Sequence, residues 1–222
     1  MNFELTEEQN LIRDMVRSFA ETEVAPSAAQ RDEDEQFDRD LMFGRLGELG
    51  LTGIVFPEEY GGAGADYLSY SIAVEELSRV CGSTGVTLSA HLSLGSNPIY
   101  LFGNEEQKKT FLTPLAQGET MGAFGLTEPS AGSDTMSMST HVRTVDGQLT
   151  MNGEKLFVNN GEYAPALLVA AIDQDAPAVG GHPALSMWMI PCSAPGITAV
   201  PEDKICQEML PFAHIQFDNV LL

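Results

Sequence analysis

Residues 123–134, AFGLTEPSAGSD, are the part of the sequence best suited by residue type and spacing to hold a ligand. Gly132 has no side chain, so the backbone there can approach a ligand closely. Thr127 and Ser133 add hydroxyl groups, and successive N–H groups in a turn can bind an anion. Two large apolar side chains of the run are available to pack against an aromatic ring system, Phe124 and Leu126. We therefore predict a loop for a planar, phosphate-bearing ligand, although the same residue types are also common in ordinary turns.

Other catalytic and metal-binding patterns are missing from the sequence. The chain has no GxSxG run of the kind that carries a serine nucleophile, and Gly61–Gly64 lacks the GxGxxG spacing of a dinucleotide loop. The four histidines have no ligand-like spacing, so no metal is expected, and His91 is interpreted as a core or pocket-lining residue. The three cysteines lie far apart without a CxxC pair, which favours a reducing cytoplasm over a disulfide framework.

The charge of the chain limits its possible partners. The sequence has 32 Asp and Glu residues against 11 Lys and Arg residues, a net charge of −21. Such a chain repels nucleic acid and anionic membrane surfaces, so any anionic ligand must be held by local donors. No apolar run is long enough to span a bilayer, and no signal peptide opens the sequence. We therefore expect neither a nucleic-acid partner nor membrane insertion.

Helical periodicity dominates the first half of the chain. Thr6 and Gln9 have the spacing of a capping box, and the helix that follows is predicted to end at Pro26. Further helices are predicted over residues 38–49, ending at Gly50; over the segment that ends at Gly82; over residues 84–102, interrupted near Asn97 and Pro98; and after Asn104 as an N-cap. Together they predict one all-helical domain over residues 1–120.

Short β-type runs replace the helical pattern from Met121 onward. Asp146–Gly147 and Asn152–Gly153 are dipeptides typical of type I′ hairpin turns. Apolar runs at residues 166–172, 184–190 and 214–222 complete the set of predicted strands. The expected fold class is α+β, with the helical domain followed by a β-barrel or sandwich-like domain over residues 121–222.

Six sequence runs in order resemble the acyl-CoA dehydrogenase family, and its short-chain or butyryl-CoA branch looks nearest. Six ordered matches are much more specific than any one of them. The matching runs are LTEEQ (5–9), PEEYGGAG (57–64), AVEELSRVCGSTG (73–85), FGNEEQKK (102–109), GLTEPSAGSD (125–134) and NGEKLFVNNG (152–161).

This resemblance implies an FAD cofactor and a set of residues around it. The run equivalent to Phe124–Ser133 would lie along the flavin, with Thr127 at the ring and Ser133 near both the pyrophosphate and the substrate. A second strand would pack against the ring through Phe157, Val158 and Asn159. Asn159 stands where the family usually has Thr, near the flavin atom that accepts hydride. Leu94 would line the acyl pocket. The full set of expected cofactor residues is Phe124, Leu126, Thr127, Gly132, Ser133, Phe157, Val158 and Asn159, and that of substrate residues is Ser133 and Leu94.

The family's catalytic base is expected to lie outside this sequence. In the family a four-helix domain of roughly 150 residues follows the point where the sequence ends, and it carries the Glu that removes the substrate α-proton. We therefore assign no catalytic residue here. Glu128 matches a position that is not the base, and three other carboxylates are interpreted as surface charges, Glu162, Glu202 and Glu208. The stretch 203–217 lacks the usual Gly and Arg, which affects the expected handling of CoA.

Two classes of function stay open at this stage. The first is flavin-dependent α,β-dehydrogenation of an acyl-CoA thioester, with the base-carrying domain missing from this chain or supplied by another polypeptide. Electrons would pass to an electron-transfer flavoprotein or a similar acceptor. The second is a non-catalytic binding module with the same fold. Related oxidase or desulfinase chemistry shares the fold. A homo- or hetero-oligomer is expected, because a missing third domain would leave apolar surface exposed.

Overall fold

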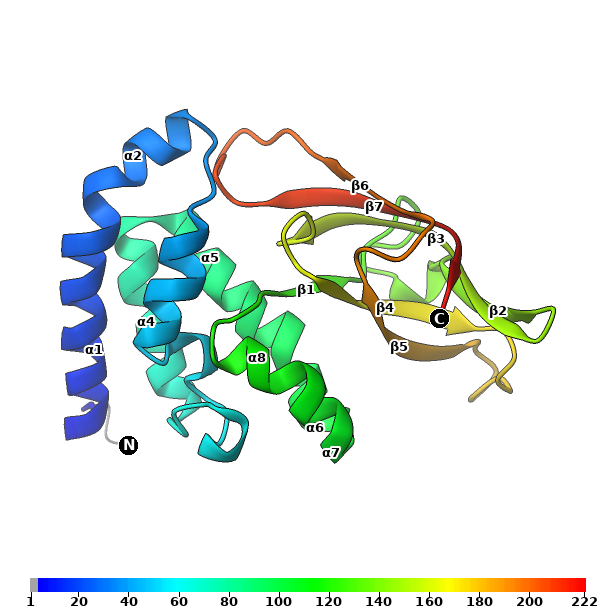
Figure 1. Ribbon diagram of the computed structural model, residues 1–222, viewed down its shortest axis with the longest axis horizontal. Helices are drawn as coiled ribbons and strands as arrows, with labels where there is room; N and C mark the ends of the chain where they lie inside the picture. Colours follow the sequence, from blue (N-terminus) through cyan, green and yellow to red (C-terminus); the bar gives the residue numbers. More distant parts are fainter. Residues whose placement is uncertain (1–3) are drawn as a thin grey trace. The chain divides into compact units, whose positions relative to one another are not determined.

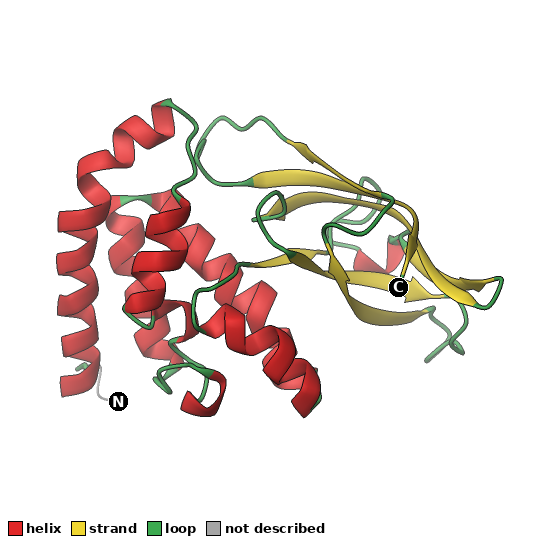
Figure 2. Cartoon of the chain, in the orientation of Figure 1, coloured by secondary structure: helices red, strands yellow, loops and turns green. Residues whose placement is uncertain are grey.

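The computed structural model describes residues 4–222, and its contacts divide the chain into two units. The helical unit comprises the residues up to Met121 together with Lys204–Leu210. The β-unit comprises Gly122–Asp203 and Pro211–Leu222. Figure 2 shows helices in the first unit and strands in the second. The structure therefore confirms the expected α+β class, with the helical part first in the chain.

The helical unit is built from short α-helices joined by wider π-helical turns (Figure 1). The capping box at its start is present, because the Thr6 side chain accepts from the Gln9 backbone and the Gln9 side chain accepts from the Thr6 N–H. The α-helices are α1 (Glu7–Phe19), α2 (Ala25–Glu33), α3 (Leu46–Glu48), α4 (Tyr67–Val80), α5 (Gly82–Ser89), α6 (Asn97–Phe102), α7 (Glu105–Gln107) and α8 (Thr113–Ala116). The π-helical turns are Ala20–Val24, Asp40–Arg45, Ala90–Ser96 and Lys108–Leu112.

Pro26 does not end the first helix, so that prediction is wrong. The chain passes from α1 through the π-helical turn Ala20–Val24 into α2, and Pro26 lies in the first turn of α2. Proline is tolerated in a first turn because its missing N–H has no partner to lose there.

The other predicted helix ends are found close to their predicted places. Gly50 has a φ of 70°, the left-handed conformation expected after a helix. Asn104 and Gln107 form a second capping box. The interruption near Pro98 takes the form of the π-helical turn Ala90–Ser96, after which α6 begins. These helix ends could be predicted from the sequence because each depends only on residues a few positions away.

Seven strands form one mixed sheet within residues 122–222. They are β1 (Gly122–Gly125), β2 (His141–Val145), β3 (Gln148–Asn159), β4 (Ala166–Asp173), β5 (Ala184–Pro191), β6 (Ile197–Pro201) and β7 (Phe212–Leu221). The order along the sheet is β1-β4-β2-β3-β7-β6, and β5 pairs with β4. The sheet curls so that β3, β7 and β6 face β1, β4 and β5 (Figure 1). The enclosed core contains residues from both layers, among them Ala123, Val158, Val169, Ile190 and Ala213.

Only one of the two predicted hairpin turns is a hairpin. Asp146 and Gly147 both have positive φ, at 51° and 81°, and they join β2 to β3 as predicted. Asn152–Gly153 instead lies inside β3, where the pairing with β7 shifts between Met151 and Gly153. The correction is a β-bulge in place of a turn, because the strand continues along a partner that enters much later in the sequence.

Candidate functional site

The 126–140 loop, which leaves β1 and leads to β2, is folded on itself by short-range hydrogen bonds. Glu128 and Ala131 exchange backbone hydrogen bonds of 3.0 and 3.1 Å, which closes a tight turn over Pro129 and Ser130. Asp134 then caps the 3-10 turn Thr135–Ser137, accepting from Met136 N–H at 3.1 Å. The loop is therefore a defined structure that leaves the positions between these turns at the surface.

A buried ion pair joins the 126–140 loop to β3. Lys155 and Glu128 are 0% and 2% exposed, and Nζ of the lysine lies 2.7 Å from a carboxylate oxygen of the glutamate. The same ammonium donates to the carbonyl of Leu126 at 3.0 Å. The oxygen that pairs with Lys155 also accepts from Thr140 N–H at 3.0 Å, and the other carboxylate oxygen accepts from the N–H and the hydroxyl of Ser139. Both ends of the loop are thus tied to one pair of charges.

Glu128 stays ionised in this environment. Burial acts to raise its pKa, but hydrogen bonds from Lys155, Thr140 and Ser139 outweigh burial and bring the pKa to about 2. Burial also lowers the pKa of Lys155, and the attraction of Glu128 opposes that change. A carboxylate with this pKa and no free oxygen is unsuited to removing a proton from a ligand. This agrees with the expectation that Glu128 is not the base.

The bulge of β3 next to this pair presents an aromatic side chain to solvent. The pairing of β3 with β7 shifts between Lys155 and Val158, and Phe157 within the shift has a φ of 61°. A bulky residue in the left-handed region is strained, and such strain is found mostly at functional sites. The Phe157 ring is 54% exposed and stacks on Phe212 of β7, with centroids 5.6 Å apart and planes 17° apart.

The structure brings the predicted loop and the predicted second strand together. Leu156 N–H donates to the carbonyl of Thr127 at 2.8 Å, so Thr127 lies beside the residue that precedes Phe157. Phe124 and Leu126 are partly buried on the way into the loop. Gly132 and Ser133 are exposed, and a Cβ placed on Gly132 would meet no atom within 4 Å. The loop that carries four of the expected cofactor residues and the strand that carries Phe157 are therefore in direct contact at Thr127 and Leu156.

Two of the predicted residues differ from their expected environment. Val158 is fully buried in the core of the β-unit, so neither its side chain nor its backbone is exposed at the surface. Leu94 belongs to the helical unit, in the π-helical turn Ala90–Ser96, and is 43% exposed. Among the carboxylates expected at the surface, Glu162 is exposed, whereas Glu202 is half-buried with one oxygen enclosed and unpaired within residues 4–222. Glu202 is therefore less exposed than the surface charge that the sequence predicted.

Asn159 has a buried acceptor without a partner in the described part of the chain. Its Oδ1 is enclosed but accepts no hydrogen bond. The Oδ1 of Asn160 is enclosed and unpaired within residues 4–222 as well, but Asn160 donates from Nδ2 to the Gly122 carbonyl at 3.1 Å and from its N–H to the Pro211 carbonyl at 2.9 Å. A buried polar group without a partner is costly, so the free acceptor of Asn159 is a natural contact for a ligand donor.

Three residues that shape this region were not predicted from the sequence. The partner of Lys155 lies 27 residues earlier in the chain. Phe212 lies in a stretch that departs from the family pattern. Asn160 appeared as part of a polar strand end. Alternation along the strand predicts that Lys155 and Phe157 lie on one face, whereas the bulge leaves Lys155 buried and Phe157 exposed.

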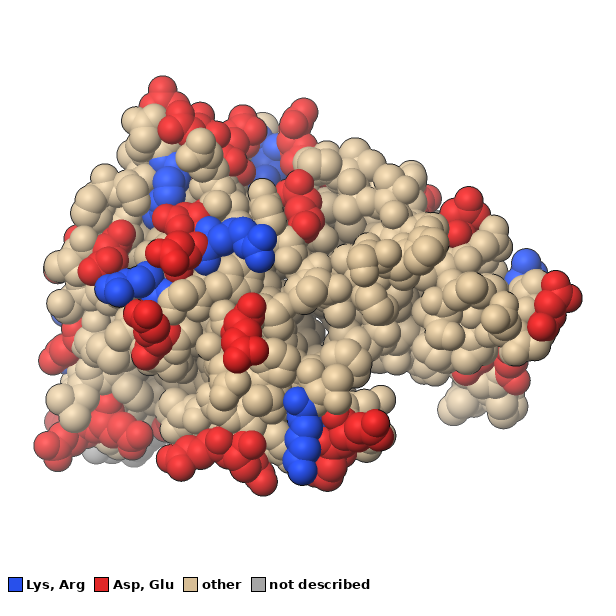
Figure 3. Space-filling model, viewed as in Figure 1, with Lys and Arg blue, Asp and Glu red and all other residues tan. Residues whose placement is uncertain are grey.

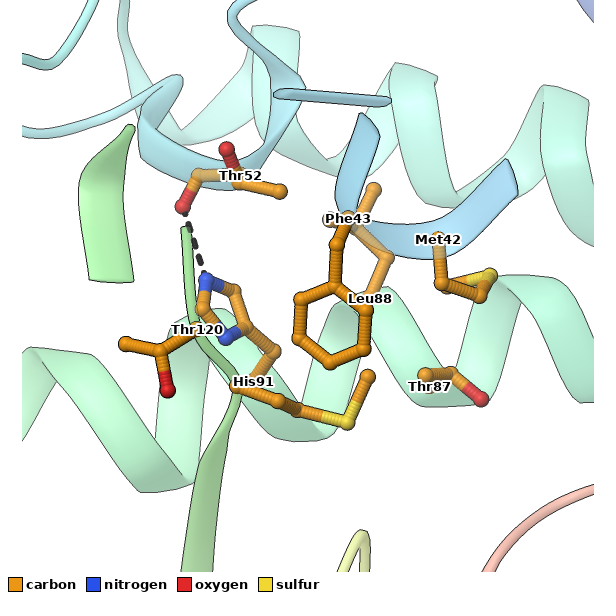
Figure 4. A pocket seen from close by; sticks show the side chains of 8 residues that line it. Met42, Phe43, Thr52, Thr87, Leu88, His91 and Thr120 are labelled. Carbon is orange, nitrogen blue, oxygen red and sulfur yellow. Dashed lines mark hydrogen bonds between the residues drawn. The ribbon is translucent and has the colours of Figure 1, made fainter. Parts of the chain in front are cut away.

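The helical unit contains a separate small cavity at His91 (Figure 4). Its volume is about 10 Å³, room for roughly one water molecule. His91 is buried and its Nε2 lies 3.0 Å from the carbonyl of Thr52. The enclosed hydroxyl of Thr120, another lining residue, has no partner within residues 4–222. The interpretation of His91 as a core, pocket-lining histidine is confirmed.

Replacing His91 with glutamine is expected to make the protein less sensitive to mild acid. Burial lowers the pKa of His91 from 6.5 to about 4, so the unfolded chain binds a proton here that the folded chain excludes. The neutral, buried His91 therefore causes no loss of stability above pH 6.5. Below that pH the free energy of unfolding falls progressively until the pH reaches about 4, and the loss is about 2 kcal/mol at pH 5. Urea titrations of both proteins at pH 7.5 and 5 measure the difference, and equal losses in the two would contradict the assignment.

The acidic surface predicted from the composition is visible in Figure 3, where carboxylates outnumber basic groups on the face shown. Several arginines are already paired. Glu76 lies 2.6 Å from Arg17 and 3.3 Å from Arg79, and Arg79 also reaches Glu21 at 2.7 Å. These cations neutralise neighbouring carboxylates of the helical unit, which limits their use for an anionic ligand.

Comparison with known proteins assigns the family. The description of the acyl-CoA dehydrogenase N-terminal domain matches residues 6–119, and that of the acyl-CoA dehydrogenase middle domain matches residues 123–220. The chain belongs to the acyl-CoA dehydrogenase family. The resemblance predicted from the six sequence runs is therefore confirmed.

Several proteins described as acyl-CoA dehydrogenases are similar to this chain over most of its length. A probable acyl-CoA dehydrogenase, YngJ of Bacillus subtilis, is 47% identical, and the match covers 99% of this chain and 57% of the relative. A short-chain specific acyl-CoA dehydrogenase of Clostridium acetobutylicum is 51% identical over 78% of this chain and 45% of the relative. The chain thus spans about half the length of the acyl-CoA dehydrogenases that it matches.

Solved acyl-CoA dehydrogenase structures share the fold. Butyryl-CoA dehydrogenase from Megasphaera elsdenii has a TM-score of 0.92 and 37% identity, covering 100% of this chain and 58% of that one. A Mycobacterium smegmatis glutaryl-CoA dehydrogenase in complex with FADH2 has a TM-score of 0.90 and 30% identity, covering 98% and 54%. A structure described as the electron-transferring flavoprotein of Acidaminococcus fermentans has a TM-score of 0.93 and 43% identity. The match covers 100% of this chain and 58% of that one.

Two further findings concern residues 4–222 of this acyl-CoA dehydrogenase family member. No described helix is both long and apolar enough to cross a membrane. The same residues include no group of three His, Cys, Asp or Glu side chains placed to hold a metal ion.

Proposed function

We propose that the β-unit of this chain binds FAD and that the chain contributes the cofactor site of a flavin-dependent acyl-CoA dehydrogenase. The single observation that carries this proposal is the bulge of β3, which holds Phe157 at a φ of 61° beside the Thr127 loop. A strained, exposed aromatic ring next to a loop with free hydroxyl groups suits a planar cofactor.

The chemistry of the surrounding residues fits a flavin. Asn159 has an enclosed acceptor that is still unpaired within the described chain, and flavin rings carry N–H donors. Gly132 leaves open space in front of the backbone, and Ser133 beside it is exposed, which suits a pyrophosphate. In a chain with a net charge of −21, neutral donors of this kind must hold an anionic group.

Each residue receives a specific role in the proposal. Phe157 packs against the ring system from one side, and the loop residues Phe124, Leu126 and Thr127 contact it from another. Val158 supports this arrangement from the core, because the whole residue is buried between the layers of the β-unit. Contacts with the thioester substrate are assigned to Ser133 and, on the helical unit, to Leu94.

Bound FAD would supply the acceptor for the hydride that leaves the β-carbon of an acyl-CoA thioester. This chain's own part is to bind and orient, and we assign no proton-removing base to its described residues. Glu128 is excluded by its saturated carboxylate. A short acyl-CoA is the proposed substrate and an electron-transfer flavoprotein the proposed electron acceptor, by analogy with the relatives. A cytoplasmic location and an oligomeric state stay predictions.

The proposal is tested by reconstitution with FAD. The purified chain is mixed with FAD, freed of excess cofactor and examined for a flavin absorption band, and butyryl-CoA is then added without oxygen. Retained FAD is the expected result, and a protein that stays colourless at high FAD concentration would overturn the proposal. Retained FAD whose absorption does not bleach with butyryl-CoA would favour the alternative, a flavin-binding module that needs another polypeptide for turnover.

Replacing Phe157 with alanine is expected to weaken FAD binding about tenfold, because an aromatic contact of this kind contributes about 1–1.5 kcal/mol. Fluorescence quenching on titration of FAD with each protein gives the dissociation constants. Phe102→Ala is the matched control, since it removes the same side chain from an 84% exposed position of the helical unit. Equal weakening in both variants would show that the Phe157 ring has no specific role.

A further inference from the structure

The Glu128–Lys155 pair is a costly feature that the proposed cofactor contacts do not explain. Two charges are almost fully enclosed, and burying charges costs free energy even when they are paired. Such a pair is commonly no better for stability than apolar residues of the same volume. Its presence next to a candidate site therefore calls for a role other than holding the β-unit together.

The partners of the pair lie almost entirely at the two ends of one loop. Lys155 donates to the Leu126 carbonyl at 3.0 Å, directly before Thr127. Glu128 accepts from Ser139 twice and from Thr140 once, at the far end of the same loop. The segment between, residues 129–138, contains Gly132 and Ser133 and has exposed positions at its centre.

The pair also acts on the strand that carries Phe157. Lys155 is the last residue before the bulge whose pairing with β7 is regular, and it lies opposite Ile215. The next residue, Leu156, donates to the Thr127 carbonyl at 2.8 Å. On the opposite side Gly125 leaves room for the lysine stem, since a Cβ at position 125 would lie 3.0 Å from Lys155 Cγ. One lysine thus fixes both the start of the loop and the start of the bulge.

We infer that Glu128 and Lys155 are positioning residues, which set the distance between the 126–140 loop and the Phe157 bulge so that both contact one planar cofactor. This inference rests on the proposed FAD site. The essential atoms are the carboxylate oxygens, because they accept the backbone N–H groups of Ser139 and Thr140. An apolar substitute fills the same volume but leaves those donors unpaired.

Two double variants separate positioning from stability. Lys155→Met with Glu128→Gln removes both charges and keeps one acceptor oxygen, which can serve the donors of Ser139 or that of Thr140. Lys155→Met with Glu128→Leu removes the charges and the acceptor. The two are neutral at the site and nearly equal in volume, so they differ mainly in the hydrogen bonds to the loop.

The first measurement is hydrogen exchange of the protein without flavin. In the leucine variant, amides of residues 129–138 are expected to exchange at least tenfold faster than in the glutamine variant, with β4 and β5 unchanged. The second measurement is FAD affinity, expected to fall at least tenfold in the leucine variant. Equal exchange and equal affinity in the two variants would overturn the inference.

Failure of this inference is distinguishable from failure of the proposed function. If no protein binds FAD, the flavin proposal fails, while the exchange measurement still tests whether the pair holds the loop. If the leucine variant does not fold, Ser139→Ala replaces it, because it removes one side-chain donor and nothing from the ion pair. Its loop amides are expected to exchange about threefold faster than those of the parent, and unchanged exchange would count against the inference.

Discussion

Replacing Gly153 with alanine is expected to destabilise the protein by about 3–5 kcal/mol, the sum of backbone strain and of overpacking in a buried site. Gly153 forms the first bulge of β3 at a φ of 140°, a conformation that residues with a side chain rarely adopt. A Cβ there would lie 2.5 to 2.8 Å from Oγ1, Cα and Cβ of Thr140. Thr140 is fully buried and donates to the Glu154 carbonyl, so it has no room to move. The free energy of unfolding is measured by urea titration.

Two other glycines provide controls for the two causes. Gly147 has a φ of 81° but open space around its Cβ position, so Gly147→Ala isolates the backbone strain, at about 1 kcal/mol. Gly132 has neither a positive φ nor a neighbour within 4 Å, and Gly132→Ala should change stability by less than about 0.5 kcal/mol. If Gly153→Ala were no worse than Gly147→Ala, the contact with Thr140 would not matter.

Replacing Lys155 alone with methionine is expected to cost about 3–5 kcal/mol at pH 7, because it leaves the Glu128 carboxylate buried and uncompensated. Glu128→Gln in the same chain should recover part of this loss, because it removes the uncompensated charge and keeps one acceptor oxygen for the loop. A double-mutant cycle on unfolding free energies gives the coupling between the two residues. A coupling near zero would mean that the two charges do not interact across their 2.7 Å separation.

The pH dependence of the Lys155→Met variant should run opposite to that of the parent. In the parent, the pKa of Glu128 is lowered from 4.5 to about 2. The ionised carboxylate therefore contributes its full stabilisation above pH 4.5, and this contribution is lost as the pH falls toward 2. Without the ammonium, burial is the leading influence and raises the pKa of Glu128. The folded variant then takes up a proton more readily than the unfolded one and gains stability on acidification. Urea titrations from pH 7 to pH 4 test this reversal.

Features set by neighbouring residues were predictable from the sequence. The Thr6 and Asn104 caps and the Asp146–Gly147 turn each depend on residues within four positions, and all three are found as predicted. Pro26 was misjudged although its neighbours are local, because a π-helical turn has no clear sequence signal.

Features set by distant pairing were not predictable in the same way. The Asn152–Gly153 dipeptide is compatible with both a turn and a bulge, and the choice is made by β7, some 65 residues later. The burial of Lys155 also depends on a distant residue, because the lysine can be buried only when Glu128 of the loop after β1 pairs with it. The positions of the loop and the second strand were predicted by resemblance, whereas the reason that they meet lies in these long-range contacts.

The assignment of Lys204–Leu210 to the helical unit has a practical consequence. The polypeptide passes from one unit to the other at positions 121, 203 and 210, so no single cut separates them. A fragment ending at Met121 would lack Met209 and Leu210, two buried side chains that belong with the helices. Recombination between family members should therefore exchange residues 204–210 together with the helices, or exchange both units at once.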